Sequence, residues 1–332
     1  MSEATGSARS RSPWLTTAAW QGLLRDRPII PLLGLLALLV VLREVARPGI
    51  LSADFLGVTL RATVPLAILA GCQTLTMLTG GIDLSVGAVA SMAGFLVATL
   101  VGGPGLGAAI LVAFAAATLA GLITGIGVGV FRVHPLIMTL GIGLVVLGLA
   151  NVWQLQMVQT GAGVADELRT LGSDRLAGIL PYSLVIFVPL ALVVLVALRR
   201  TGYGRLLYAI GDNPVAARLS GARAWQVLVV LYIVSALLAA VGGLLISGLT
   251  NVASVTLADS YVLPSVAASV IGGTSILGGR GGYGGTIVGA LILTVLSSLL
   301  TALGYPEAVR QVLYGVIIVA VAAAYTRVTA QS

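Results

Sequence analysis

The sequence predicts an all-α protein that crosses a membrane many times. Its 332 residues have a mean hydropathy of +1.09, and 58% of them are hydrophobic whereas 9% are charged. Soluble globular domains do not reach such values. In addition, charge-free stretches follow one another at roughly the 20 residues that a helix needs to cross the hydrocarbon core of a bilayer. We therefore expect one integral membrane unit without a sizeable soluble domain.

About ten transmembrane helices are expected within residues 28–326. A polar, Ser/Arg-rich tail of residues 1–27 comes first and lacks the small-residue cleavage site of a signal peptide. A short tail of residues 327–332 ends the chain. Arg43, just beyond the first span, is expected to snorkel to the interface. The expected spans are 28–42, 62–82, two within 84–131 that GGPGLG separates, 133–159, 180–198, 225–249, 262–277, 283–303 and 311–326.

The arginines predict an orientation. All 18 basic residues are arginine, and with ten spans and a cytoplasmic N-terminus 12 of them fall on the inner side. Most of the acidic residues then lie outside. This distribution agrees with the positive-inside rule, so both termini are expected in the cytoplasm.

Ten spans also divide into two halves of five. Because five is odd, the second half would be inverted in the membrane relative to the first. A Gly-Gly turn occurs in both halves, in TGGIDLSVG and in IGGTSILGG. Small residues four apart, as at Gly121, Gly125 and Gly129, indicate close packing between helices.

Composition excludes several kinds of site. Without lysine the chain cannot carry a standard phosphate-loop ATPase motif or form a Schiff base. One cysteine (Cys72) and one histidine (His134) cannot form a disulfide or a typical zinc site. The net charge of +7 indicates membrane orientation rather than nucleic-acid binding, because the arginines form no single aromatic-interleaved patch. With no nucleophile–base pair or cofactor loop, we expect no enzyme, no bound cofactor and no metal.

Asp83 is the one carboxylate well inside the apolar pattern. Gly80 and Gly81 break the preceding helix, and Asp83 can cap the next one by accepting the backbone N–H of Ser85 or Val86. A cap that stabilises a broken helix is the favoured interpretation. The alternative is that the break lines a pathway, since irregular backbone at membrane depth is tolerated only beside protein or a cavity. The two interpretations are compatible.

The scarcity of ionisable groups in the spans argues against a proton- or sodium-driven carrier and against a channel with a charged ring. It favours a pathway for a neutral solute, driven by energy supplied elsewhere. Amides and hydroxyls suit a polyhydroxylated substrate, although for any single residue hydrogen bonding between helices is the stronger interpretation. The candidate pathway residues are Gln73, Thr74, Thr76, Asp83, Ser85, Asn151 and Gln154.

A charged island at residues 199–224 interrupts the apolar pattern with five arginines. It predicts one short helix. Asn213 can cap it and Pro214 fits its first position. Gly221 predicts its end.

The predicted helix of the island has two kinds of face. Val215 and Leu219 are four residues apart and form an apolar ridge, whereas Arg218 stands off it. Such a helix can seat in a groove of a partner protein or lie on lipid headgroups. We favour the protein partner, because about two turns are few for stable adsorption to a membrane.

The loop at residues 160–180 is the longest on the outer side. It carries Arg169 and Arg175 among acidic residues. One interpretation is that it docks an extracellular solute-binding protein by charge pairing, and the other is a solvated loop.

Three blocks, LTGGIDLSVGA, GRLLYAIGDNPVAARLSGA and IGGTSILGGRGGYGGTIVGALI, occur in this order. In sequence and spacing they resemble the permease subunits of ribose-type ABC importers for monosaccharides. The resemblance runs from about residue 54 to 324. It implies a ten-helix permease in the inner membrane of a bacterium. It also implies dimerisation with a second permease subunit.

The resemblance further implies two ABC ATPase subunits that hold ATP and Mg, and an extracytoplasmic sugar-binding protein. The island would be the coupling segment that contacts the ATPase, through Asn213, Pro214, Val215, Arg218, Leu219 and Gly221. A stand-alone carrier for a small neutral solute is the alternative function, and uptake without an ATPase would establish it. A membrane protein without any pathway is a second alternative.

Overall fold

The computed structural model describes residues 29–49, 52–157, 163–176 and 180–329, so the predicted tail at residues 1–27 lies outside the described residues. Its regular elements are helical apart from one two-stranded antiparallel hairpin. The elements are α2 Ile29–Ala46, α3 Ala53–Leu78, α4 Val86–Leu100, α5 Leu106–Gly129, α6 Pro135–Met157, α7 Asp166–Ser173, β1 Arg175–Leu176, β2 Leu180–Pro181, α8 Ser183–Arg200, α9 Gly202–Asp212, α10 Pro214–Leu219, α11 Ala224–Thr250, the 3-10 helix η2 Asp259–Tyr261, α12 Val262–Ile271, α13 Tyr283–Ala302 and α14 Glu307–Thr329.

Each expected span corresponds to a helix, but the lengths differ. Seven described helices are long and apolar enough to cross a membrane, namely α2, α3, α5, α6, α8, α11 and α13. The helices α4 and α12 have 15 and 10 residues and are too short to span alone. The protein is thus an all-α polytopic membrane protein. The helix α14 continues through Thr329, so it includes the first three residues of the predicted tail at 327–332, whose cytoplasmic location stays a prediction.

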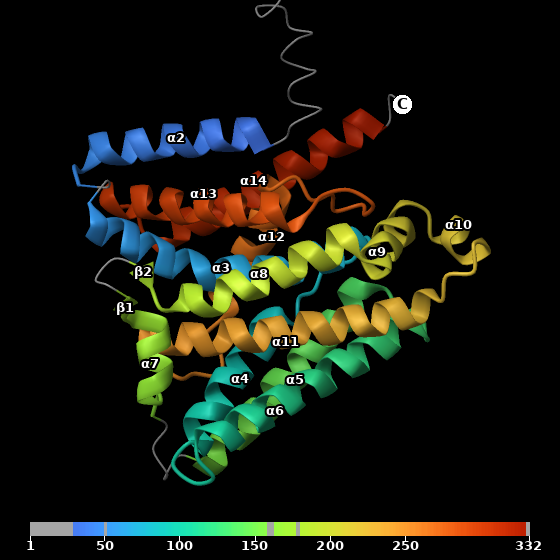
Figure 1. Ribbon diagram of the computed structural model, residues 1–332, viewed down its shortest axis with the longest axis horizontal. Coiled ribbons are helices and arrows are strands. Elements are labelled where there is room, and N and C mark those ends of the chain that lie inside the picture. Colours follow the sequence, from blue (N-terminus) through green and yellow to red (C-terminus); the bar gives the residue numbers. More distant parts are fainter. Residues whose placement is uncertain (1–28, 50–51, 158–162, 177–179, 330–332) are drawn as a thin grey trace, which may run out of the picture.

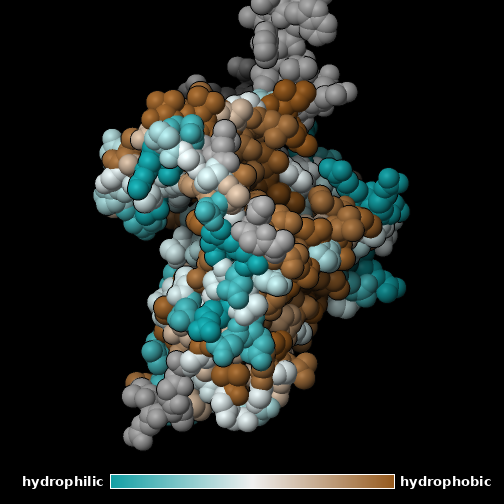
Figure 2. Space-filling view, turned by 60° about the vertical axis from the view of Figure 1, so that its left-hand side comes forward, coloured by the Kyte–Doolittle hydropathy of each residue, from teal (hydrophilic) through white to brown (hydrophobic). Residues whose placement is uncertain are grey.

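The long helices run between two ends of the molecule. The helices α9 and α10 lie at one end, and α7 with the β1–β2 hairpin lies at the opposite end (Figure 1). Figure 2 brings the α7 end forward and shows a band of hydrophilic residues there beside broad hydrophobic surface. A hydrophobic surface with polar ends is what a bilayer requires of a spanning protein.

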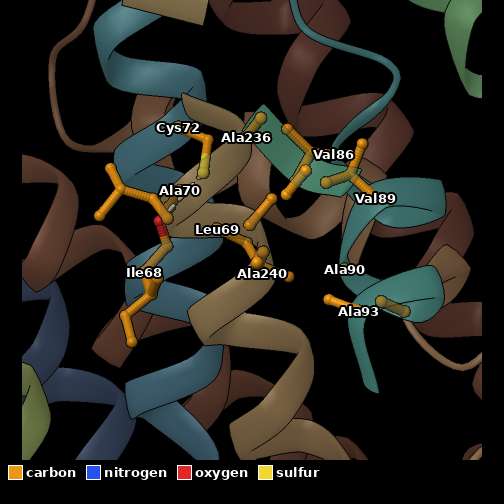
Figure 3. Close-up of a cluster of buried hydrophobic side chains, with 14 of the residues drawn as sticks. Ile68, Leu69, Ala70, Cys72, Val86, Val89, Ala90, Ala93, Ala236 and Ala240 are labelled. Atoms are coloured by element: carbon orange, nitrogen blue, oxygen red, sulfur yellow. Dashed lines mark hydrogen bonds between the residues drawn. The ribbon is translucent and has the colours of Figure 1, made fainter. Parts of the chain in front are cut away.

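The helices α3 and α11 form the centre of the molecule. Two thirds of the apolar window of each is buried, far more than in α2, α5, α6 or α8. The helix α3 packs against α12 and α13, which follow α11 in the chain, while α11 packs against α4 and α5, which follow α3. Figure 3 shows small and aliphatic side chains of α3, α4 and α11 meeting in this core.

Glycines allow α5 to approach α11 closely. A Cβ added at Gly125 would lie 2.6 Å from the Cα of Val229, and one at Gly129 would lie 2.9 Å from the carbonyl oxygen of Trp225. The packing indicated by the small residues four apart is therefore confirmed for α5. The close approach aligns the end of α5 with the start of α11 at the α10 end.

Both central helices are followed by an irregular segment and a short helix. Residues 79–85 join α3 to α4, and residues 251–258 followed by η2 join α11 to α12. The two short helices meet at their N-terminal ends. The Ser91 hydroxyl accepts the backbone N–H of Ala258 at 2.8 Å, and Gly87 lies against Val262.

Arg43 does not snorkel, and that prediction is wrong. Its side chain is buried, donates to Ser298 Oγ at 3.2 Å and to the Arg47 carbonyl at 2.7 Å, and lies 5.0 Å from the ring centroid of Phe55. The reason is that α2 packs along α13, so protein rather than solvent surrounds the guanidinium.

Candidate functional site

The break after α3 is held by a network of buried polar side chains. Asp83 is buried, and its Oδ1 accepts the backbone N–H of Ser85 at 3.0 Å and the Ser85 hydroxyl at 2.6 Å. Its Oδ2 accepts the hydroxyl of Ser235 on α11 at 2.8 Å. The predicted bond from Ser85 N–H to Asp83 is confirmed, but the predicted cap is wrong, because the N-cap of α4 is Ser85 and Asp83 lies two residues before it. The carboxylate also ties the break to the central helix α11.

Two further side chains bind the backbone of the same segment. Gln73 donates to the Asp83 carbonyl at 2.7 Å and accepts the Asp83 N–H at 3.2 Å. Thr139 on α6 donates to the Ile82 carbonyl and accepts the Leu84 N–H, both at 3.1 Å. Gln73 and Thr139 thus satisfy four backbone groups that no helix satisfies, as buried polar groups require.

The other candidate pathway residues fall into two groups. Thr74 and Thr76 are buried, and Thr74 Oγ1 lies 2.6 Å from Thr286 Oγ1 on α13. Asn151 and Gln154 are exposed on α6, towards the α7 end. The structure therefore brings Gln73, Asp83 and Ser85 together at the break, but not Asn151 or Gln154.

The charged island forms two helices rather than the one predicted. The helix α9 comes first, capped by the Thr201 hydroxyl, which accepts the Gly204 N–H at 3.2 Å. The helix α10 follows, and Asn213 Oδ1 accepts the N–H groups of Val215 and Ala216, each at 3.0 Å. The predicted cap and the start at Pro214 are confirmed.

The observed end of α10 and its apolar ridge also agree with the sequence prediction. Gly221 has φ +88°, the left-handed conformation that ends a helix. Val215 is 55% exposed and Leu219 is 85% exposed, whereas Ala217 is buried. The apolar ridge therefore points away from the protein.

The three sequence blocks meet at four glycines, Gly80, Gly211, Gly278 and Gly279, which we call the glycine junction. Gly279 N–H donates to the carbonyl of Leu78, the last residue of α3, at 3.0 Å. A Cβ on Gly278 would lie 2.8 Å from the Gly211 carbonyl oxygen and 3.0 Å from the Gly80 nitrogen. A Cβ on Gly211 would collide with the Leu78 carbonyl oxygen. The backbone atoms of three segments are therefore in direct contact: the break after α3, the charged island and the loop before α13.

Tyr208 adds a side-chain link between the second and third blocks. Its hydroxyl donates to the Gly281 carbonyl at 3.0 Å. Burial raises the pKa of Tyr208, although Arg199 opposes the shift, so the phenol keeps its proton at neutral pH.

Replacing Tyr208 with phenylalanine removes this bond alone. We expect the free energy of unfolding to fall by about 0.5–1.5 kcal/mol. Thermal unfolding of the detergent-solubilised protein measures the change, with Tyr305→Phe as control because Tyr305 is 50% exposed. Equal unfolding temperatures for the two variants would contradict the link.

A cavity of about 460 Å³ with both polar and apolar lining lies towards the α7 end, between α3, α12, α13 and α14. Ser297 and Tyr314 hydroxyl oxygens are 2.5 Å apart in it, and Arg310 pairs with Glu307 at 2.6 Å. None of the candidate pathway residues lines it. No sequence pattern predicts this cavity, because its polar residues share no motif: Ser260, Tyr261, Thr294, Ser297, Glu307, Arg310 and Tyr314.

The segment predicted as a loop at residues 160–180 contains α7 and the hairpin. Arg169 pairs with Asp166 at 2.8 Å, and Arg175 pairs with Asp54 at the start of α3. Both candidate docking arginines thus have partners within the chain. In the part of the chain that the structure describes, His, Cys, Asp and Glu do not gather into a group of three that could hold a metal ion.

Comparison with known proteins places this arrangement in a family. A protein-family model described as the permease component of branched-chain amino acid transport systems matches residues 56–322. The ribose import permease protein RbsC of Bacillus subtilis is 35% identical over 289 residues, which cover 87% of this chain and 89% of the relative. The chain belongs to the permease family of ribose-type ABC importers.

Other members of the ribose-type permease family are similar over most of their length. The fructose import permease protein FrcC of Rhizobium meliloti is 31% identical over 297 residues, 87% of this chain and 82% of the relative. The galactofuranose transporter permease protein YtfT of Escherichia coli is 32% identical over 267 residues, 79% of this chain and 76% of the relative. No solved structure matches the chain. Permease components of this family are not catalytic, and separate subunits hydrolyse ATP.

Proposed function

We propose that the protein is the permease subunit of an ATP-driven importer and moves a monosaccharide across the inner membrane of a bacterium. The similar permeases are named for ribose, fructose and galactofuranose, which are all neutral and polyhydroxylated. Asp83 and Arg43 are the only buried charged side chains among the described residues, which suits a neutral solute. The stand-alone carrier is not favoured, since the relatives are permease components of import systems.

The exposed ridge on α10 is the observation that carries the proposal. A hydrophobic side chain such as Leu219, 85% exposed on a capped helix at a polar end, is expected to be covered by a partner. The partner in this family is an ABC ATPase with ATP and Mg. Within the segment 199–224, α10 is then the docking site: Val215 and Leu219 contact the ATPase, Asn213, Pro214 and Gly221 shape the helix, and Arg218 stands off the ridge.

Replacing Leu219 with aspartate is expected to abolish sugar-stimulated ATP hydrolysis by the reconstituted complex. A carboxylate on the ridge would have to lose its water in an apolar groove, which the binding energy cannot offset. Ala209→Asp is the matched control, because Ala209 is exposed on α9 and off the ridge.

Retention of full coupling by Leu219→Asp would refute the docking assignment. Sugar uptake by liposomes that contain this chain alone would refute the ATP-driven function. Ribose, fructose and galactofuranose are the first substrates to test in both assays.

The topology that we propose has ten transmembrane segments in two inverted halves, α2–α6 and α8 with α11–α14. The boundary falls before α8, so the charged island follows the sixth segment. In each half a central helix leads through a break to a short helix, and each central helix packs among helices of the other half. Superposition of the halves tests the inversion, and cysteine labelling at residues 1–27 and 327–332 tests whether both termini are cytoplasmic.

The remaining partners are a second copy of this chain and an extracytoplasmic sugar-binding protein. Asn151 and Gln154 are exposed polar residues on a helix whose other exposed residues are mainly apolar. In a homodimer they would face a shared pathway. Arg169 and Arg175 at the α7 end remain the candidates for docking the binding protein, with their acidic neighbours as competing partners.

A further inference from the structure

A pocket of about 520 Å³ separates α10 from the helical body at the α10 end. Its walls are the end of α5 around Val128, the inner side of α10 at Pro214 and Arg218, and the start of α11 around Trp225. None of the candidate residues for the solute pathway lines it. The pocket lies apart from the hydrogen-bond network around Asp83 and from the cavity towards the α7 end.

The pocket is positively charged. Arg132, Arg218 and Arg223 line it, and no acidic residue does. The ion pairs between described residues involve Arg169, Arg175 and Arg310 instead, so the three pocket arginines have no carboxylate partner within the described chain. The N-terminus of α11 at Arg223 adds its own positive potential.

One of these arginines has an unusual backbone. Arg132 has φ +56°, the left-handed conformation that a residue with a long side chain rarely adopts. The strain is located where the chain turns from α5 into α6, and it presents a guanidinium to the pocket. Strained residues persist where the surrounding structure requires them, often at binding sites.

The rest of the lining is apolar. Val128, Val130, Trp225 and Leu228 form it, and Val130 and Trp225 are each about half exposed. Tryptophan is enriched at the membrane–water interface, because its side chain is amphipathic and sits at the level of the lipid headgroups. A ligand of this pocket therefore needs an anionic group for the arginines and an apolar part for the valines and tryptophan.

The pocket and the ridge occupy different faces of α10. Pro214 and Arg218 are one turn apart and face the pocket, whereas Val215 and Leu219 form the exposed ridge. Successive residues of a helix are turned by about 100°, so the two faces are separated by about that angle. A partner on the ridge leaves the pocket face of α10 free for a second ligand.

We infer that this pocket binds the phosphate headgroup of an anionic phospholipid, with its acyl chain along Val130 and Trp225. The forked guanidinium groups of arginine bind phosphate oxygens in pairs. The lipid connects α10 to the ends of α5 and α11. Its binding is a property of this chain alone and does not depend on which sugar is transported.

The test uses the full chain in vesicles of phosphatidylcholine with or without phosphatidylglycerol, followed by extraction and native mass spectrometry of retained lipid. The double variant Arg132→Gln/Arg223→Gln should retain phosphatidylglycerol about 100-fold less, since losing each charge-assisted hydrogen bond from a guanidinium to the phosphate reduces binding about tenfold. Arg200→Gln/Arg205→Gln is the charge-matched control, because both residues are exposed at the same end outside the pocket.

A charge-conserving pair, Arg132→Lys/Arg223→Lys, should bind more phosphatidylglycerol than the glutamine pair but less than the parent, because an ammonium keeps the charge without the paired guanidinium contact. Thermal unfolding of the glutamine pair should match that of the parent, which excludes misfolding as the cause of the loss. Equal loss in the control pair, or none in the pocket pair, would overturn the inference. Competition with glycerol phosphate distinguishes the source of the phosphate. If this soluble headgroup displaces the lipid at equal concentration, the occupant is a soluble anion and the lipid assignment is wrong.

Discussion

Replacing Gly211 with alanine is expected to reduce sugar-stimulated ATP hydrolysis by about 5–150-fold, the range that a coupling free energy of about 1–3 kcal/mol spans. The added Cβ would collide with the Leu78 carbonyl oxygen and lie 2.6 Å from the Gly279 nitrogen. Both are backbone atoms and cannot rotate away. The helix α9 must therefore move off α3 and the loop before α13, and α10 moves with it because one residue, Asn213, joins them.

The same displacement is expected to weaken the Gly279 N–H bond to the Leu78 carbonyl, which is 3.0 Å long. Overpacking at such a contact reduces stability by about 1–3 kcal/mol. Thermal unfolding and ATP hydrolysis are measured on the same preparations of the reconstituted complex.

Gly202→Ala is the matched control for Gly211→Ala. Gly202 begins the same helix, and a Cβ there meets nothing closer than Arg205 Nη2 at 3.7 Å. The control should keep parental stability and coupling. Parental coupling in Gly211→Ala would show that the glycine junction does not connect α10 to the central helix α3.

The features that sequence predicted correctly depend on neighbouring residues. Asn213 caps α10 through N–H groups two and three residues away, and the Asp83 bond to Ser85 spans two residues. Such bonds join residues that are two or three positions apart, so a short sequence pattern predicts them without knowledge of the fold. The spacing of Gly121, Gly125 and Gly129 is likewise a property of one helix.

The features that sequence did not predict depend on contacts between distant segments. The helix α9 was missed because its three glycines, Gly202, Gly204 and Gly211, lower helix propensity. They are tolerated because Gly204 and Gly211 pack against backbone of α8 and α3. Arg43 was misplaced for a similar reason, since its partner Ser298 is 255 residues away.

Gln73 shows why a polar residue in an apolar helix cannot be assigned from its own pattern. A pathway lining and an anchor for a distant break both require a polar side chain on the inner face of α3. Only the fold decides that its amide reaches both backbone groups of Asp83, ten residues on. The glycine junction also required the fold, because its three blocks are distributed over about 200 residues.

Replacing Gln73 with leucine is expected to lower the free energy of unfolding by about 2–6 kcal/mol. The leucine fills a similar volume but leaves the Asp83 N–H and C=O without partners in a buried segment, and each unsatisfied group costs about 1–3 kcal/mol. Such a loss is a large share of the roughly 5–15 kcal/mol that stabilises a typical protein. Gln226→Leu, at an exposed position of α11, is the control and should unfold as the parent does.

The same variant separates an anchor from a sugar contact. If Gln73 anchors the break, Gln73→Leu unfolds at lower temperature, and its residual folded fraction keeps the parental KM for uptake. If Gln73 instead contacts the sugar, stability is unchanged and KM rises. The anchor is favoured here because Gln73 is fully buried and both ends of its amide are already bonded at 2.7 and 3.2 Å. A sugar hydroxyl could bind this amide only after the break opened, which would also release the Asp83 carboxylate from Ser235.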